Sequence, residues 1–474
     1  NSDPDPWISG VCANSKQVRP GDLFIARRGS SFDGAAFAKE AMQAGARAIA
    51  TDTYLPECSA IPQLILSDMA FVEAKLAAHY YDYPDQELFL IGVTGTNGKT
   101  TASWILYQLL SKLHGKTGWI GTVEYRIGDS VLPATRTTPG AAENQLLLRK
   151  MRQSGCLSAV MEVTSHALDQ GRVYHIAFDM CLFTNLSKDH LDYHGSMEQY
   201  CLAKNRLFLQ LNEQKKLTPK WAIVNRDCPW HQRILQGCTA PCITYGCSPG
   251  SDLMATDLSF SATHTECKLS FQNRPPFPIR SPLLGKYNLY NLLGAIACLL
   301  AKGFTLEEIF PWLDTIIPPK GRLEPIPNKK GFSIFVDFAH TGDGLHQVLS
   351  TLREICQGRL IVVFGCGGDR DRNRRSEMGQ AASHLAEYTV ITSDNPRSED
   401  PLVICQEIAQ AFSSTNYRIE PDRRRAIELA LQEAKRGDIV LIAGKGHEKT
   451  QIQGQAALPF DDVQVATEIC QTLP

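Results

Sequence analysis

The sequence lacks any long apolar segment. Its longest apolar stretches, such as Leu292 to Ala301, fall well short of the roughly 20 residues that a membrane-spanning helix needs. No charged segment followed by an apolar one opens the chain, so nothing there resembles a signal peptide. We therefore expect no insertion into a membrane.

The sequence also lacks an excess of charge of either sign. Its 48 lysines and arginines nearly balance its 50 aspartates and glutamates, which gives a formal net charge of -2 at pH 7. A protein that coats nucleic acid carries a marked positive charge instead. We therefore expect no nucleic-acid partner.

Paired cysteine motifs are missing as well. The 15 cysteines are scattered, odd in number and without CxxC spacing, which argues against a disulfide framework. A loose cluster leaves a structural zinc site open as an alternative; it consists of Cys228, Cys238, Cys242 and Cys247. The pattern is typical of a reducing compartment, so the cytoplasm is the expected location. A monomer is the default expectation.

Alternating strand and helix patterns predict an α/β protein of three domains. A length of 474 residues is consistent with about three domains. We expect a small N-terminal α/β domain over 1–86, a central P-loop-type ATPase domain with a mostly parallel sheet over 87–317, and a C-terminal Rossmann-like domain over 318–474. Expected N-terminal strands are 21–26, 46–51 and 63–67, with helices over 35–44 and 71–81 and a linker at 83–85. Short β segments are expected over 240–283, and the alternation of LAEYTVIT predicts a strand over 385–392.

A phosphate-binding loop is predicted between a strand and a helix at GVTGTNGKTT, residues 92–101. Backbone amides of such a loop hold phosphate oxygens, while Lys99 reaches the terminal phosphate and Thr100 a Mg²⁺ ion. The pattern departs from GxxxxGK[ST], because Val93 stands where the first glycine belongs. The residues assigned to the nucleotide here are Gly95, Thr96, Asn97, Gly98, Lys99, Thr100 and Thr101.

Two further segments carry residues suited to a metal. Glu162 ends the apolar run SAVMEV and suits Mg²⁺, although a capping or turn carboxylate remains an alternative. His190, in KDHLDYH, stands close to Asp192 and His194; these three residues are compatible with zinc or with a solvent-facing loop.

Lys204 is predicted to lie on the apolar face of a helix over 196–210. A desolvated lysine has a lowered pKa and a nucleophilic amine, which can add CO₂ to give a carbamate. The alternative is a lysine that extends to the surface. Both readings follow from the residues alone.

The loop TGTNGKTT resembles the ATP loop of the Mur ligases and of the related folylpolyglutamate synthases. Further motifs resemble those of the tripeptide-forming Mur ligases, in the same order over nearly the whole chain. They are EVTSHALDQGR (162–172), TNLSKDHLDYHGSMEQYCLAK (184–204), DNPR (394–397) and AGKGHE (443–448). The resemblance implies ATP-dependent amide-bond formation through an acyl phosphate.

The resemblance also implies roles for individual residues. Glu162, His190 and a carbamylated Lys204 would hold Mg²⁺ and, with Lys99, support catalysis. The ATP contacts in the second half of the chain would be Asn288, Asn291, Arg322, Asp337 and His340. The acceptor UDP-MurNAc-L-Ala-D-Glu would meet Ser15, Ser30, Ser31, Phe32, Thr137, Thr138, Thr164, Gln170 and Arg172. Thr164 is a departure, because serine is usual there.

The segment DNPR predicts the identity of the incoming amine. A carboxylate and a guanidinium on a stiff backbone suit the ammonium and carboxylate at the distal end of meso-diaminopimelate. Lysine-adding members of the family differ at the position of Arg397. The implied amine-binding residues in the C-terminal domain are Arg370, Asp394, Asn395, Pro396, Arg397, Gly444 and Glu448.

Several alternatives to this function remain open. They are a lysine-adding ligase, a ligase like folylpolyglutamate synthase and a noncatalytic binder of the UDP-sugar peptide. A GTPase should show NKxD after a strand, which NLSKD at 185–189 does not fit. GCGGDR at 365–370 lacks the last glycine of GxGxxG, so NAD binding is disfavoured.

Overall fold

The computed structural model describes residues 6–28, 33–213, 216–272 and 274–473. The chain forms two compact units. The first comprises 1–255, 269–277 and 290–312, and the second comprises 256–268, 278–289 and 313–474. The predicted domain boundaries at 86 and 317 stay a prediction.

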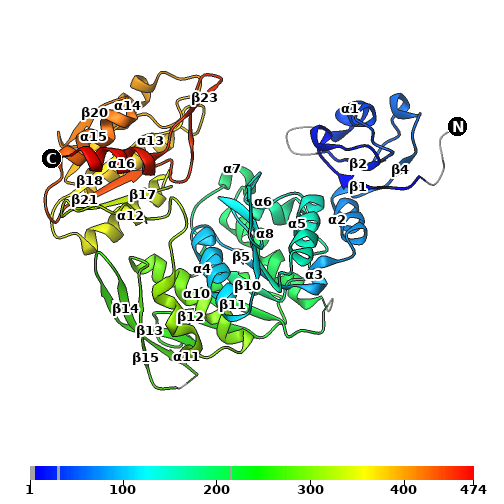
Figure 1. The fold of residues 1–474 in the computed structure, drawn as a ribbon, viewed down its shortest axis with the longest axis horizontal. Coiled ribbons are helices and arrows are strands. Elements are labelled where there is room, and N and C mark those ends of the chain that lie inside the picture. Colours follow the sequence, from blue (N-terminus) through cyan, green and yellow to red (C-terminus); the bar gives the residue numbers. More distant parts are fainter. Residues whose placement is uncertain (1–5, 29–32, 214–215, 273, 474) are drawn as a thin grey trace. The chain divides into compact units, whose positions relative to one another are not determined.

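The chain begins with a four-stranded parallel sheet in the order β1-β2-β3-β4 (Figure 1). Its strands are β1 Gly10–Cys12, β2 Asp22–Ala26, β3 Ala48–Thr51 and β4 Gln63–Ile65. Its helices are α1 Ala38–Gln43 and α2 Met69–Tyr80. The three strands predicted here are confirmed. The segment predicted as a linker instead contains helix α3, Pro84–Glu87, in which proline occupies a first-turn position that needs no amide donor.

An eleven-stranded sheet follows, in the order β15-β14-β13-β12-β11-β10-β5-β9-β6-β7-β8. The strands from β12 to β6 in this order pair in parallel, and β7 and β8 add an antiparallel edge. The strands are β5 Phe89–Thr94, β6 Thr117–Ile120, β7 Glu124–Ile127, β8 Ser130–Pro133, β9 Ser158–Glu162, β10 Met180–Phe183, β11 Trp221–Asn225, β12 Cys242–Gly246, β13 Leu253–Phe260, β14 Thr265–Phe271 and β15 Phe277–Ser281. The short β segments expected over 240–283 are thus β12 to β15.

Helices cover this sheet and fix the segments that carry the site. They are α4 Lys99–Leu113, α5 Ala141–Gln153, α6 Ser165–Asp169, α7 Leu191–His194, α8 Met197–Leu209, α9 His231–Ile234, α10 Lys286–Lys302 and α11 Leu306–Ile309. Apolar side chains of α5 and α8 pack with those of β5, β9 and β10 in one core cluster. Burying this apolar surface is the main stabilising contribution to such a layer.

The C-terminal sheet has the order β16-β17-β21-β18-β19-β20, parallel except for β16 at its edge. The strands are β16 Glu324–Pro325, β17 Ser333–Asp337, β18 Leu360–Phe364, β19 Tyr388–Ile391, β20 Tyr417–Ile419 and β21 Ile439–Ala443, and a separate hairpin is formed by β22 Thr450–Gln453 and β23 Ala456–Pro459. The helices are α12 Gly342–Ile355, α13 Asn373–Leu385, α14 Pro401–Ala409, α15 Arg423–Glu433 and α16 Asp462–Thr472.

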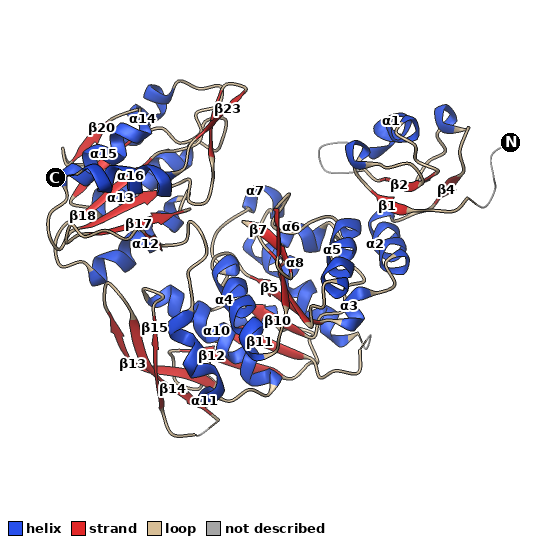
Figure 2. Cartoon of the chain, in the orientation of Figure 1, coloured by secondary structure: helices blue, strands red, loops and turns tan. Residues whose placement is uncertain are grey.

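Two apolar cores line the two faces of this sheet, and Figure 2 shows the helices that cover it. Helices α12, α13 and α14 contribute to one, and α15 and α16 to the other. Strand β19 begins at Tyr388 rather than at Leu385, where the alternation predicted its start, because Leu385 ends α13. The predicted α/β class with mostly parallel sheets is confirmed. In the described parts of the chain, no helix is long and apolar enough to cross a bilayer.

Candidate active site

The predicted phosphate loop joins β5 to α4, which begins at Lys99. Gly95 has φ 150° and Gly98 has φ 83°, a region that side chains strongly disfavour. A Cβ at Gly98 would also lie 2.2 Å from Asn291 Oδ1. The loop thus requires glycine for backbone conformation and for close packing against α10. Its amides lie at a helix N-terminus, where anions bind favourably.

The segment after β10 holds this loop in place. The backbone amide of Asn97 donates to Asn185 Oδ1 at 3.0 Å, and Thr184 Oγ1 donates to the carbonyl of Asn97 at 2.6 Å. Lys99 Nζ donates to the carbonyls of Gly95 and Thr96 at 2.9 and 2.8 Å, so its side chain folds over the loop. Its ammonium therefore already lies beside the turn that would bind phosphate.

Glu162 is fully buried at the end of β9 and accepts hydrogen bonds from Thr100 and Thr122. Thr100 Oγ1 donates at 2.9 Å, Thr122 Oγ1 at 3.0 Å and the Thr122 backbone amide at 2.8 Å. The carboxylate and the first turn of α4 are thereby joined. Sequence reasoning missed Thr122, although it follows the carboxyl end of β6, where ligand-binding residues of parallel sheets gather.

Lys204 is buried on α8, as its apolar neighbours predicted, with 1% exposure. Its Nζ donates to the carbonyl of Gly95 at 2.8 Å and lies 4.6 Å from the centre of the Tyr200 ring. Burial, helped by the charge of Lys99, lowers the pKa of Lys204 well below its ordinary value. The burial of this lysine is confirmed, whereas its carbamylation stays a prediction.

His190 precedes α7 with a left-handed backbone, φ 53°. Its Nε2 lies 3.4 Å from Asp189 Oδ2. Partial burial and the neighbouring His166, Lys99 and Lys204 lower the pKa of His190 to about 4, against the opposing effect of Asp189. A neutral imidazole can bind a metal ion.

The zinc alternatives receive no support from the geometry. Across the described residues, no group of three or more histidine, cysteine, aspartate or glutamate side chains is arranged to hold a metal ion. The Nε2 atom of His194 instead lies 3.0 Å from the hydroxyl of Ser165. All 15 cysteines are free thiols.

The residues predicted to bind the acceptor peptide cluster beside Glu162. Thr138 Oγ1 donates to the Glu162 carbonyl at 2.9 Å and accepts from the Thr164 amide at 3.1 Å. Thr137 Oγ1 lies 3.2 Å from Thr122 Oγ1. The hydroxyl at Thr164, where serine was expected, accepts from the Ala167 amide and so caps α6.

Arg172 and Gln170 extend this cluster. Arg172 donates to the Thr138 carbonyl at 3.1 Å and to Gln170 Oε1 at 3.0 and 2.6 Å. Arg27, from the end of β2, donates to the Gln170 carbonyl and pairs with Glu73 at 3.1 Å. Burial and the charges of Arg136 and Arg27 lower the pKa of Arg172. Such a concentration of guanidinium groups favours an anionic ligand.

The predicted uridine contacts are described only in part. Ser15 Oγ donates to Glu40 Oε2 at 3.0 Å. Ser30, Ser31 and Phe32 lie outside the described residues. A cavity of about 940 Å³ lies beside Ser15, and its lining includes Asn14, Lys16, Arg19, Arg136 and Lys150.

The predicted nucleotide contacts of the second half lie on α10 and around the end of β17. Asn288 and Asn291 occupy the first turns of α10 and are buried. Asp337 accepts from the Leu323 amide at 2.7 Å and the Ala339 amide at 2.8 Å, and burial raises its pKa. Arg322 lies over the Phe338 ring at 5.0 Å, and His340 Nδ1 lies 2.9 Å from the Phe338 carbonyl.

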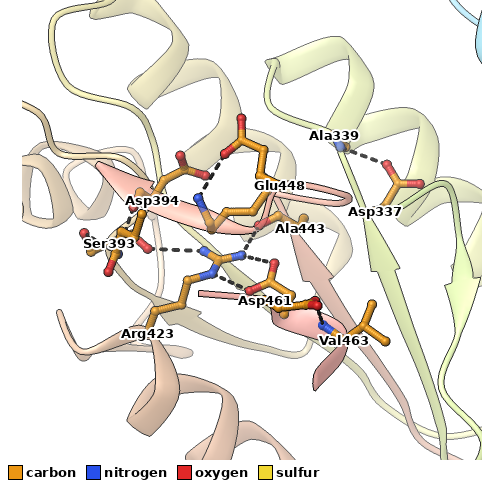
Figure 3. Close-up of polar contacts among 12 residues, drawn as sticks. Asp337, Ala339, Ser393, Asp394, Arg423, Ala443, Glu448, Asp461 and Val463 are labelled. Atoms are coloured by element: carbon orange, nitrogen blue, oxygen red, sulfur yellow. Dashed lines mark hydrogen bonds and ion pairs between the residues drawn. The ribbon is translucent and has the colours of Figure 1, made fainter. Parts of the chain in front are cut away.

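The DNPR segment begins just after β19 (Figure 3). Asp394 is buried, and a Cβ at Gly444 would lie 2.7 Å from its Oδ2 atom. Burial raises the pKa of Asp394, while Arg423 and Lys445 oppose that shift. The two predicted residues Asp394 and Gly444 are thus adjacent, at the ends of β19 and β21.

Arg397 is fixed by its backbone and by its guanidinium. Its φ is 54°, its amide donates to the Ile452 carbonyl at 3.0 Å, and its Nη1 donates to the Gly368 carbonyl at 2.7 Å. A Cβ at Gly367 would lie 2.9 Å from Arg397 Nη1 and 3.7 Å from Arg370 Cγ. The loops after β18 and β19 therefore bring the two predicted arginines together.

Glu448 and Asn395 are linked through a residue that the sequence did not single out, Lys445. Asn395 Nδ2 donates to Glu448 Oε2 at 2.9 Å. Lys445 Nζ donates to Asn395 Oδ1 at 3.0 Å and to Glu448 Oε2 at 2.9 Å. Burial raises the pKa of Glu448, but the ion pair and these bonds outweigh it and leave that pKa lowered.

Arg423 was missed as well, and it holds the two chain segments that carry Asp394 and Gly444. Its side chain extends toward Ser393 and Ala443 (Figure 3), and it donates to their carbonyls at 3.2 and 2.9 Å. It also pairs with Asp462 at 2.7 Å, with both side chains fully buried. In the sequence, RRRA and FDDV give no sign of this pairing.

Comparison with known proteins places these motifs in a family. Three family models match: the Mur ligase family catalytic domain over 7–81, the Mur ligase middle domain over 93–299 and the Mur ligase glutamate ligase domain over 321–446. These matches support the predicted three-domain architecture.

Individual relatives cover nearly the whole chain. A UDP-N-acetylmuramoyl-L-alanyl-D-glutamate--2,6-diaminopimelate ligase of Geobacillus thermodenitrificans is 43% identical, over 98% of this chain and 94% of the relative. A solved structure with that enzyme name has a TM-score of 0.69 at 32% identity, covering 98% of this chain and 95% of the other. The MurF ligase of Thermotoga maritima in complex with ADP shares the fold, with a TM-score of 0.66 at 20% identity, covering 98% of this chain and 97% of the other. The chain belongs to the Mur ligase family.

Proposed function

We propose that the chain is an ATP-dependent ligase that joins meso-2,6-diaminopimelate to the side-chain carboxyl of D-glutamate in UDP-MurNAc-L-Ala-D-Glu. This reaction is a step of peptidoglycan precursor synthesis. The observation that carries the proposal is that Glu162 and the buried Lys204 contact the phosphate-loop region within one compact unit. The name of the 43% identical relative supports the same reaction.

The nucleotide would be held first by the phosphate loop. Backbone amides of Gly98 and of the first turn of α4 would donate to phosphate oxygens, and Lys99 can leave its carbonyl partners to meet the terminal phosphate. The resemblance also assigns nucleotide contacts to Asn288, Asn291, Arg322, Asp337 and His340.

A Mg²⁺ ion fits the donors around Glu162. Oxygen ligands come from Glu162 and Thr100, His190 would be neutral near pH 7, and a Lys204 carbamate would add a further oxygen donor. When bound, Mg²⁺ would offset charge on the transferring phosphoryl group. Of these residues, Glu162, Thr100 and Lys204 are buried, whereas His190 is partly exposed.

The acceptor carboxylate would lie against the cluster of Thr137, Thr138, Thr164, Gln170 and Arg172. Arg172 can pair with a carboxylate in bidentate fashion, and the threonine hydroxyls can orient the peptide. The carboxylate is a poor electrophile until phosphorylation gives it a leaving group. The cavity beside Asn14 and Lys16 offers room for the UDP-sugar end.

The amine would bind in the C-terminal pocket. Arg397, with Arg370 beside it, can pair with the distal carboxylate of diaminopimelate, while Asp394 and Glu448 can pair with the distal ammonium. L-Lysine lacks that carboxylate and would leave Arg397 without its ligand partner. The cytoplasmic location and the monomeric state predicted from the sequence remain proposals.

The test is an assay of phosphate release with UDP-MurNAc-L-Ala-D-Glu, ATP, Mg²⁺ and one amine at a time. We expect turnover with meso-diaminopimelate to exceed turnover with L-lysine by at least about 100-fold in kcat/KM. Comparable turnover with L-lysine would identify a lysine-adding ligase. Turnover with folate as the acceptor and glutamate as the amine would favour the alternative of a ligase like folylpolyglutamate synthase. Binding of the UDP-substrate without phosphate release would indicate a noncatalytic binder.

A further inference from the structure

Lys445 has the environment of a buried charge rather than of a surface lysine. Its side chain is fully buried in the turn after β21, and its ammonium bonds to Asn395 and Glu448. Lysine is almost never fully buried unless it is paired. Both of its hydrogen-bond partners belong to the predicted amine pocket, so the lysine acts on the groups that would meet substrate.

Formal charges in this part of the pocket leave an excess of one negative charge. Asp394, Glu448 and Asp462 are the carboxylates, and Arg423 and Lys445 are the cations that act on them. Arg423 already donates to both oxygens of Asp462 and to two backbone carbonyls. Lys445 is therefore the cation shared between Asp394 and Glu448.

That balance suits a zwitterion. One excess negative charge on this side can take one ammonium, and the side of Arg397 and Arg370 can take one carboxylate, so the two sides together suit an end that carries both charges. Without Lys445 the same groups would have an excess of two negative charges instead of one. They would then favour an end that has an ammonium and no carboxylate, as the distal end of L-lysine has.

We propose that Lys445 is a specificity-determining residue that sets the charge of the amine pocket and orients Glu448 and Asn395, so that a zwitterionic amine end is preferred over a purely cationic one. The inference rests on the proposed function, since it concerns the same amine. Glu448 keeps 35% side-chain exposure while its Oε2 atom is held by Lys445, which leaves the carboxylate accessible to a ligand cation. Lys445 itself need not touch the substrate.

The experiment compares kcat/KM for meso-diaminopimelate and for L-lysine in the parent, Lys445→Met and Lys449→Met. Lys449 is the matched control, because it is 61% exposed and pairs with Asp461 rather than with the pocket carboxylates. We expect Lys445→Met to lower the ratio of kcat/KM for diaminopimelate to kcat/KM for L-lysine by at least about 10-fold, equivalent to about 1.4 kcal/mol. Lys449→Met should leave this ratio unchanged. Lys445→Gln, which can donate the same hydrogen bonds without the charge, should show the same loss of preference and serves if the methionine variant does not fold.

A pH profile separates this role from a structural one. Lys445 lowers the pKa values of Asp394 and Glu448, and the titratable groups around these two carboxylates include Arg423, Asp462, His340 and His447. Its removal should shift the acid limb of kcat/KM for diaminopimelate to higher pH, which loss of packing alone would not do. Equal losses of kcat/KM with both amines would overturn the role of Lys445. The same holds if the ratio of the two kcat/KM values and the acid limb both stay unchanged. Absence of turnover by the parent with either amine would overturn the proposed function instead.

Discussion

Replacing Arg423 with methionine should strongly destabilise the C-terminal unit. The guanidinium makes four hydrogen bonds, two to Asp462 and one each to the carbonyls of Ser393 and Ala443. Both members of the ion pair are fully buried, so the substitution leaves a carboxylate without its cation in the protein interior. Removing one partner of such a pair costs about 3–5 kcal/mol. That is a large fraction of the about 5–15 kcal/mol that keeps a domain folded.

A second variant tests whether the buried charge is the cause. Arg423→Met combined with Asp462→Leu removes both charges, and apolar replacement of a buried ion pair is often neutral. The two carbonyls still lose their donor, at about 1 kcal/mol each. We therefore expect a loss of about 2 kcal/mol, smaller than in the single variant. Arg424→Met, which removes an exposed pair with Glu468, should change stability by less than about 0.5 kcal/mol.

Urea denaturation followed by far-UV circular dichroism would measure these differences. Hydrogen exchange of peptides that contain β19 and β21 would show where the effect lies, because the guanidinium bonds to the residues that follow or end these strands. Exchange there should accelerate in the single variant and not in Arg424→Met. A double variant that is as unstable as the single one would refute the reasoning, since the loss would then not come from an uncompensated carboxylate.

Three further predictions concern the reaction itself. Lys99→Ala should lower kcat by more than about 100-fold, or about 3 kcal/mol. The affinity for the UDP-substrate, measured by calorimetric titration, should be largely retained. Loss of both kcat and this affinity would contradict a role confined to the phosphate. Lys204→Ala should lose nearly all phosphate release, with partial recovery on adding short-chain carboxylates in place of the carbamate; activity equal to the parent would contradict that role. Arg397→Ala should remove most of the preference for meso-diaminopimelate over L-lysine, and a preference unchanged in kcat/KM would show that this arginine does not read the distal carboxylate.

The parts of the fold and site that depend on local sequence were predictable. The phosphate loop needs glycine at fixed positions and a lysine at the start of a helix, so TGTNGKTT carries its own signature. The burial of Lys204 follows from its apolar neighbours on α8. The alternation of strands and helices likewise predicted the parallel sheets.

The parts that depend on contacts between distant segments were not predictable. Thr122 lies 40 residues before Glu162 in the chain, yet its hydroxyl and amide both bond to that carboxylate. Arg423 and Asp462 begin two different helices, and only the packing of α15 and α16 on one face of the sheet brings them together. The start of β19 was misjudged because Leu385, apolar and in phase with the strand pattern, completes α13 instead.

The two buried lysines show why residue type alone does not determine chemistry. Lys204 donates to a carbonyl that also accepts from Lys99, so a neighbouring cation adds to desolvation and its pKa falls. Lys445 donates to Glu448, so its partner is an anion. A neutral amine can react with CO₂, whereas a paired ammonium can only set the charge of its surroundings. The sequence places both lysines among small or apolar residues, and the difference in their expected roles comes from the group that each Nζ contacts.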